Sequence, residues 1–111
     1  MKAGKLKGIA VSTAKRSALV PELPTVAEAG LKDFEVSGWY AVFAPAGTPR
    51  PIVQRLNAEI VRVLEIPDLK QFLFNQGLEL SPSTPEQLGA QLRSDIARWG
   101  KVIRETGIKA N

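Results

Sequence analysis

The stretch VSGWYAVFAPAGTP, residues 36–49, contains the clearest fold signal of the chain. Residues 36–43 are rich in aromatic and β-branched side chains, which are typical of β-strands. Apolar residues fall on both alternating faces, so the segment is predicted to be a strand covered on both sides. Pro45 and Gly47 then turn the chain, and Thr48 and Pro49 suit a helix N-cap and first helical position. The stretch is therefore predicted to be a strand, a turn and the start of a helix.

Three helices are predicted after this strand, because apolar residues recur there at helical spacing. Their apolar positions are, in order, Ile52, Leu56, Ile60 and Val63; Leu69, Phe72 and Leu73; and Leu88, Leu92, Ile96, Trp99 and Ile103. Thr84, Pro85 and Gln87 form a capping-box pattern at the start of the last helix. Gly77 and Gly107 stand where the second and third helices should end.

The residues before this strand suggest one more short strand and one more short helix. Residues 9–11 form a brief apolar run after a glycine, which suits a buried strand, and residues 12–17 follow as a polar loop. Thr25 and Glu28 have the spacing of a capping box, and Gly30 ends the predicted helix quickly. Residues 78–80 could add a third, short strand.

Composition limits the chemistry that the chain can perform. Of its 111 residues, 44% are hydrophobic and 23% charged, which fits one small globular domain. The chain has no cysteine and no histidine, so thiolate nucleophiles, disulfides and the commonest general base are excluded. The net charge is +4, but the basic residues are scattered and lack the aromatic interleaving of a nucleic-acid surface. No nucleic-acid partner is predicted.

No catalytic or metal-binding group stands out. Ser12 and Lys15 have the spacing of a Ser-Lys pair, but nothing else in the sequence supports an activated nucleophile. The acidic residues are spread over loops and show neither a calcium-loop pattern nor a paired arrangement. Phosphate-binding glycine motifs are missing. The chain is therefore predicted not to be an enzyme and to need no metal or cofactor.

Six ordered stretches of the sequence resemble one family. They are residues 4–12, 14–17, 24–30, 39–49, 52–59 and 99–103, which read GKLKGIAVS, AKRS, PTVAEAG, WYAVFAPAGTP, IVQRLNAE and WGKVI. In this order they resemble the receptors of tripartite tricarboxylate transporters, also called the Bug family. The resemblance covers nearly the whole chain, but it matches only the C-terminal part of such a receptor.

This resemblance implies a fold, a function and a location. The fold would be the C-terminal fragment of a two-lobed periplasmic-binding-protein fold of type II, α/β in class, with few strands and three or four helices. Residues 1–35 would end the second lobe, and residues 36–111 would form the return strand and C-terminal helices of the first lobe. Family members capture a small carboxylate in the periplasm and deliver it to membrane permease subunits. The chain itself shows no signal-peptide pattern.

Two groups of site residues follow from this expectation. Ser12, Thr13 and Ala14 leave a predicted strand as ligand loops in α/β lobes do, so they are the predicted ligand contacts; a plain polar loop is the alternative. Val36, Ser37 and Gly38 are the predicted hinge, because a glycine can absorb a backbone rotation between lobes.

A second function class remains open beside the receptor. The chain could be a stand-alone interaction module that dimerises through its helices. An unpaired strand edge at residues 36–43 and the long apolar stripe of the last helix would both favour a homodimer of the fragment.

Overall fold

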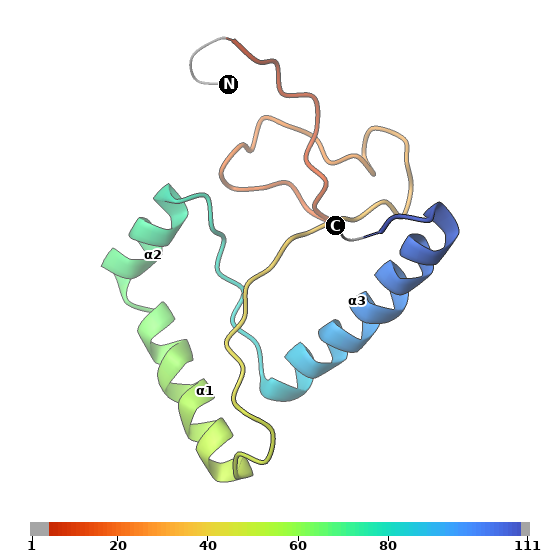
Figure 1. Cartoon of the computed structure of the whole chain (residues 1–111). Helices are drawn as coiled ribbons and strands as arrows, with labels where there is room; N and C mark the ends of the chain where they lie inside the picture. The colour runs from red at the N-terminus through yellow and green to blue at the C-terminus, as the bar shows by residue number, and fades with distance from the viewer. Residues whose placement is uncertain (1–4, 110–111) are drawn as a thin grey trace. The chain divides into compact units, whose positions relative to one another are not determined.

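The computed structural model describes residues 5–109 of the chain (Figure 1). Three helices follow one another in its second half: α1 at Arg50–Leu64, α2 at Pro67–Asn75 and α3 at Pro85–Thr106. The described residues fall into two compact units. The first, here called the loop unit, contains the residues up to Phe43 together with Leu73–Glu79. The second, the helical unit, contains Ala44–Phe72 and the residues from Leu80 onward.

Helix α3 begins and ends as the sequence predicts. The Thr84 hydroxyl accepts a hydrogen bond from the Gln87 backbone N–H at 3.2 Å, and the Gln87 side-chain oxygen accepts one from the Thr84 N–H at 2.9 Å. This reciprocal pair satisfies two donors that a helix start leaves without partners. At the other end, Gly107 adopts a left-handed φ of 68° and its N–H bonds to the Ile103 carbonyl at 3.0 Å. The predicted capping box and glycine stop are both confirmed.

Helix α1 starts one residue later than predicted. Pro49, not Thr48, is the N-cap, and no side chain caps this helix. The Thr48 hydroxyl instead donates to the Pro45 carbonyl at 2.8 Å, and the Thr48 N–H donates to the same oxygen at 3.2 Å. The Thr48 hydroxyl therefore closes the tight turn before the helix, whereas the sequence pattern predicts that it caps α1.

Helix α2 ends as predicted. After Asn75, Gly77 takes a left-handed φ of 83°. The Leu78 N–H then reaches back to the Leu73 carbonyl at 3.0 Å, which satisfies an acceptor near the helix end.

The predicted strands are not formed within the described residues. Residues 36–43 and 78–80 belong to no ladder, and residues 9–11 contribute only an isolated parallel bridge between Val11 and Thr25. The prediction of strands was wrong for a simple reason: residue types can favour an extended chain, but a strand exists only where a neighbouring strand accepts its hydrogen bonds. The α/β class is replaced, in the described part of the chain, by three helices and extended loops.

The short helix predicted after Thr25 is reduced to a single turn. The Ala29 N–H bonds to the Thr25 carbonyl at 3.0 Å, and Gly30 then takes a φ of 118°. Because Gly30 comes so soon, the turn cannot add further hydrogen bonds, and such a short helix has little stability of its own.

The helical unit is held together by polar links as well as by helix contact. Helices α1 and α3 touch, and Arg50 pairs with Glu86 at 3.2 Å near the starts of these helices. The Asn57 amide donates to the Ser83 carbonyl at 2.9 Å. Among the described residues, no apolar side chain is fully buried, and Thr25 is the one buried residue. Apolar faces of the helices therefore remain open to solvent in this chain.

Candidate functional site

The candidate ligand loop, residues 12–17, starts from a fixed point in the loop unit. The Val11 N–H donates to the Pro24 carbonyl at 2.9 Å, and the Val11 carbonyl accepts from the Val26 N–H at 2.9 Å. These two bonds enclose Thr25, whose exposed fraction is 2%. The loop therefore leaves a short backbone pairing next to the most buried residue described.

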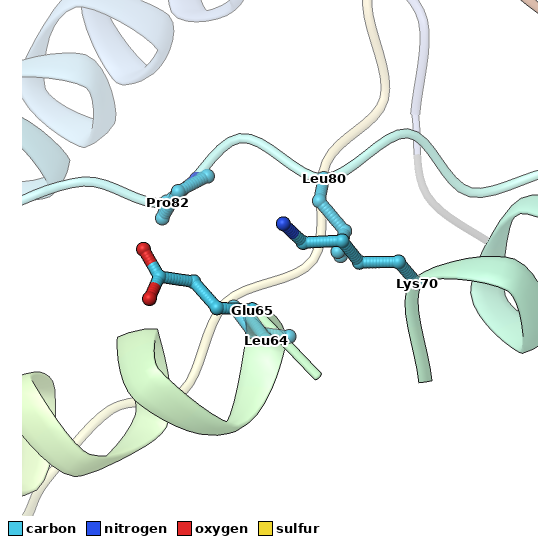
Figure 2. Close-up of a pocket in the computed structure, with 5 residues that line it drawn as sticks. All are labelled: Leu64, Glu65, Lys70, Leu80 and Pro82. Atoms are coloured by element: carbon cyan, nitrogen blue, oxygen red, sulfur yellow. The ribbon is translucent and has the colours of Figure 1, made fainter. Parts of the chain in front are cut away.

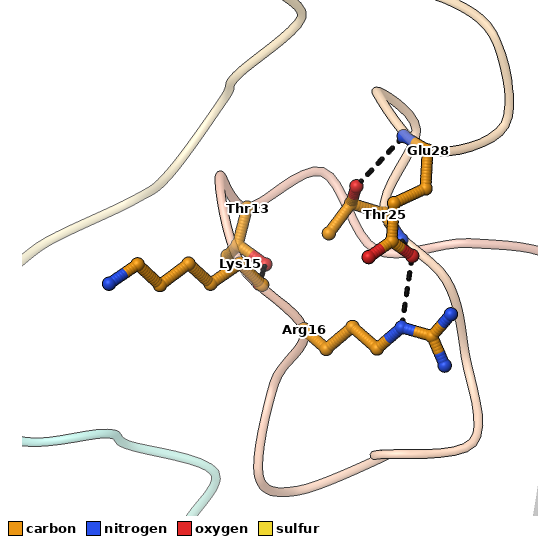
Figure 3. A network of polar contacts seen from close by, with 5 residues as sticks. All are labelled: Thr13, Lys15, Arg16, Thr25 and Glu28. Atoms are coloured by element: carbon orange, nitrogen blue, oxygen red, sulfur yellow. Dashed lines mark hydrogen bonds and ion pairs between the residues drawn. The ribbon is translucent and has the colours of Figure 1, made fainter.

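An ion pair connects the end of this loop to a capping box at Thr25 and Glu28 (Figure 3). The Glu28 N–H donates to the Thr25 hydroxyl at 3.0 Å, and the Glu28 carboxylate accepts from the Thr25 N–H at 3.1 Å. The same carboxylate oxygen accepts from Arg16 Nε at 2.9 Å. Since both charged side chains are about half exposed, the pair contributes less than about 1 kcal/mol. Its effect is to fasten the loop at Arg16 onto the turn at Glu28.

Ser12 and Val36, which were predicted to belong to different functional groups, are brought together. The Ser12 hydroxyl donates to the Val36 carbonyl at 2.7 Å, and the Val36 N–H donates to the Ser12 carbonyl at 2.8 Å. The predicted ligand loop thus contacts the first predicted hinge residue through two hydrogen bonds. Ser37 and Gly38, the other predicted hinge residues, are exposed.

Thr13 and Ala14 remain available at the surface of the loop unit. The half-buried Thr13 donates its hydroxyl proton to the Lys15 carbonyl at 2.6 Å, which closes a tight local turn. In the part of the chain that the structure describes, the backbone N–H groups of Thr13, Ala14 and Lys15 have no protein acceptor. Three successive backbone N–H groups therefore remain as donors in this loop.

Sequence reasoning missed the residues that shape this loop. Glu28 was read only as a cap, although its carboxylate also accepts from Arg16. Ser17 was left without a role, but its hydroxyl donates to the Glu79 carboxylate and accepts from the Leu19 N–H at 3.1 Å. Glu79 lies far away in the sequence, so no local pattern could have indicated the pairing. The Thr-x-x-Glu spacing was the one signal that pointed to this cluster.

The helical unit contains a separate, shallow pocket of about 180 Å³ (Figure 2). Its lining consists of Leu64, Glu65, Lys70, Leu80 and Pro82. Figure 2 shows the Glu65 carboxylate and the Lys70 ammonium group both directed toward this space. Because the two charges have opposite signs and both side chains are exposed, the pocket has no clear preference for an anion or a cation.

Residues 5–109 contain neither a metal-binding cluster nor a membrane-spanning helix. No group of three or more acidic, cysteine or histidine side chains is placed to hold a metal ion in residues 5–109. No helix in that range is both long and apolar enough to cross a membrane.

The fold is that of part of a periplasmic binding protein. The solved structure of the periplasmic binding protein BugD matches with a TM-score of 0.76 and 32% identity, covering 100% of this chain and 38% of BugD. R. palustris Rpa4515, solved with adipate, matches with a TM-score of 0.74 and 37% identity, covering 96% of this chain and 36% of Rpa4515.

The sequence comparison identifies the family. Residues 1–108 match the tripartite tricarboxylate transporter family receptor. A Pseudomonas protein encoded in the tcbD–tcbE intergenic region is 42% identical over 110 residues, which cover 98% of this chain and 33% of that protein. BugT of Bordetella pertussis is 36% identical over 109 residues, which cover 98% of this chain and 33% of BugT. The chain belongs to this receptor family and spans about a third of the length of these relatives.

This family consists of periplasmic binding receptors that are not enzymes. The predicted resemblance and the predicted absence of enzymatic activity are therefore both confirmed.

Proposed function

We propose that the chain is part of a periplasmic receptor that captures a small carboxylate and presents it to the permease of a tripartite tricarboxylate-type transporter. The observation that carries this proposal is its membership of the receptor family, joined to its similarity to Rpa4515, which was solved with adipate. In this proposal, residues 1–35 complete the second lobe of the receptor, and residues 36–111 return to the first lobe.

The ligand contacts are proposed to lie in the loop that contains Ser12, Thr13 and Ala14. Support comes from the unpaired N–H groups of Thr13, Ala14 and Lys15, because a carboxylate oxygen accepts hydrogen bonds and has none to donate. The hydroxyl protons of Ser12 and Thr13 are already donated to backbone carbonyls. Backbone donors held in shape by the Thr13 hydroxyl are therefore the recognition chemistry that we propose.

A chimeric receptor tests the proposal, because this chain spans about a third of its relatives. In the chimera, this chain replaces the matching part of Rpa4515, and adipate binding is measured by isothermal titration calorimetry. Thr13→Ala removes the clamp on the Lys15 carbonyl and should weaken adipate binding about 3- to 10-fold, the usual scale for one hydrogen bond. Thr13→Ser keeps the hydroxyl and should bind nearly as the parent chimera does.

Ser94→Ala is the matched control, since Ser94 is an exposed hydroxyl residue of α3 in the other unit. It should leave adipate affinity unchanged. Equal affinities of the parent chimera and Thr13→Ala would show that the loop does not contact the ligand. A folded parent chimera that binds no small dicarboxylate would refute the carboxylate-receptor proposal itself.

A second candidate function, self-association, rests on the open apolar face of α3. Ile96, Trp99 and Ile103 recur at helical spacing and expose 64%, 37% and 49% of their surface. We propose that the isolated chain covers this face by forming a homodimer, as an interaction module would. Sedimentation equilibrium at micromolar concentration should then give twice the 12.0 kDa monomer mass, and Ile96→Glu should return the monomer. A wild-type monomer at that concentration contradicts the dimer.

A further inference from the structure

Within the predicted ligand loop, Ser12 differs from Thr13 and Ala14 because it is hydrogen-bonded to Val36. Ser12 donates its hydroxyl proton to the Val36 carbonyl and accepts the Val36 N–H on its own carbonyl, at 2.7 and 2.8 Å. Its side-chain donor is therefore occupied within the loop unit. A carboxylate ligand would have to displace this bond before the Ser12 hydroxyl could donate to it.

The same contact limits where the chain can rotate. Val36 is half-buried and held at both its N–H and its carbonyl. Within the described residues, Ser37 and Gly38 make no hydrogen bond, whereas Trp39 again has a contact of its own. Rotation about Val36 itself would break these two hydrogen bonds, whereas the backbone groups of Ser37 and Gly38 hold none of their own among the described residues. A side-chain Cβ added at Gly38 would meet no atom within 4 Å, so this position is sterically open.

We propose that Ser12 is a positioning residue that ties the ligand loop to the crossover segment and confines the hinge rotation to Ser37 and Gly38. This inference rests on the proposed receptor function and refines it. A carboxylate held by the N–H groups of Thr13 and Ala14 would pull on Ser12, the adjacent residue. Ser12 would in turn hold Val36, the residue directly before the proposed rotation at Ser37 and Gly38. Ligand capture and lobe closure are coupled through the Ser12–Val36 contact, in which the Ser12 hydroxyl makes one of the two hydrogen bonds.

The tie itself is tested without a ligand, by amide hydrogen exchange of the full 111-residue chain followed by NMR. Ser12→Ala removes the hydroxyl bond to the Val36 carbonyl and leaves the Val36 N–H bonded only to the Ser12 backbone carbonyl. This remaining bond should open more often, so exchange at the Val36 N–H should accelerate about 2- to 10-fold, the scale of one exposed hydrogen bond. Ser12→Thr keeps a hydroxyl at the same position and should restore slow exchange. Thr13→Ala should leave the Val36 exchange rate unchanged.

The coupling is tested in the chimera with Rpa4515, by stopped-flow measurement of adipate dissociation. Ser12→Ala should raise the dissociation rate several-fold and change the association rate little, because the closed state loses a restraint. Ser12→Thr should return the parent rate, which a general loss of stability would not predict. Thr13→Ala should weaken adipate binding while Val36 exchange stays at the parent rate.

The two arms separate the failure of this inference from the failure of the proposed function. If Ser12→Ala leaves both Val36 exchange and adipate dissociation unchanged, the positioning role is wrong. If it weakens adipate binding with no change in Val36 exchange, Ser12 is a direct ligand contact and the inference is also wrong. A parent chimera without carboxylate binding refutes the receptor function, and the exchange arm still decides whether Ser12 holds Val36.

Discussion

Two Thr-Pro pairs with the same sequence signal should respond differently to the loss of their hydroxyl groups. Thr48-Pro49 and Thr84-Pro85 both predict a threonine N-cap followed by a proline at the first helical position. In the structure, only Thr84 caps its helix, since its hydroxyl accepts from the Gln87 N–H at 3.2 Å. The Thr48 hydroxyl donates to the Pro45 carbonyl, outside the helix. Replacing each threonine by alanine therefore distinguishes a hydroxyl that caps a helix from one that closes a turn.

The expected magnitudes follow from the partners that each substitution removes. Thr84→Ala leaves the Gln87 N–H without its acceptor and breaks half of the reciprocal pair, so it should cost about 1 kcal/mol of unfolding free energy. Thr48→Ala removes one exposed hydrogen bond in a turn and should cost no more than about 0.5 kcal/mol. Thr84→Ser keeps the accepting oxygen and should cost only a few tenths of a kcal/mol, on the order expected between good caps.

The assay is urea unfolding of the full chain followed by far-UV circular dichroism, with the concentration held constant because the apolar faces can associate. The three variants are compared in one buffer, and their urea midpoints are converted to unfolding free energies with one common denaturant slope. A loss in Thr48→Ala equal to or larger than that in Thr84→Ala would refute the reasoning, because it would place a functional cap at α1. A full loss in Thr84→Ser would show that the Thr84 methyl group, not the hydroxyl, stabilises α3.

Three further substitutions test the electrostatics and the hinge. The pKa of Glu86 lies below its ordinary value because its own backbone N–H hydrogen-bonds the carboxylate, with the Thr84 hydroxyl and Arg50 adding to the effect against partial desolvation. The ionised Glu86 carboxylate therefore stabilises the fold above its unfolded-state pKa, and this stabilisation is lost as the pH falls through the lower folded-state pKa. In Glu86→Gln, the unfolding free energy should consequently fall less steeply as the pH is lowered. Glu28→Gln should cost less than about 1 kcal/mol, and the difference from the parent should shrink in about 0.5 M salt; a salt-independent difference would exclude the ion pair as its cause. Gly38→Ala should slow ligand-induced closure of the chimera in stopped-flow fluorescence without lowering the urea midpoint, because the added Cβ has space; unchanged closure would remove Gly38 from the hinge.

Helix positions could be predicted from the sequence because their signals are local. The Thr84–Gln87 capping box and Gly107 enclose α3 within one segment, and both formed as predicted. The start of α1 shifted by one residue because a turn four residues long competed for the Thr48 hydroxyl. Sequence patterns identify which residues can cap a helix, but the competing acceptor decides which of them does.

Strand formation and the contacts between site residues depend on partners that are distant in the sequence, so no local sequence pattern predicts them. Residues 36–43 have the composition of a strand, yet they form no β-ladder with another described segment. Ser12 was selected for its place after a predicted strand, but its bond to Val36 spans 24 residues. Ser17 and Glu79 lie 62 residues apart. One sequence can suggest that such residues matter, but only the fold reveals which of them meet.

The loop unit and the helices differ in what stabilises them, and this difference bears on how the chain would work within a receptor. The candidate ligand loop is held by short-range polar bonds: the Val11 pairing, the Thr25–Glu28 box and the Arg16 ion pair all connect residues within one continuous stretch. Apolar side chains are exposed in both parts, for example Ile9 and Tyr40 in the loop unit and Ile96 and Ile103 in α3. The polar bonds of the loop do not depend on apolar burial, whereas burial of an apolar face is the larger source of stability for a helix. Loss of a covering partner should therefore loosen the helices before it disturbs the loop. Protection of the Val36 amide should then outlast protection in the middle of α3 when the chain is studied alone, and the reverse order of exchange would show that the loop depends on the same burial as the helices.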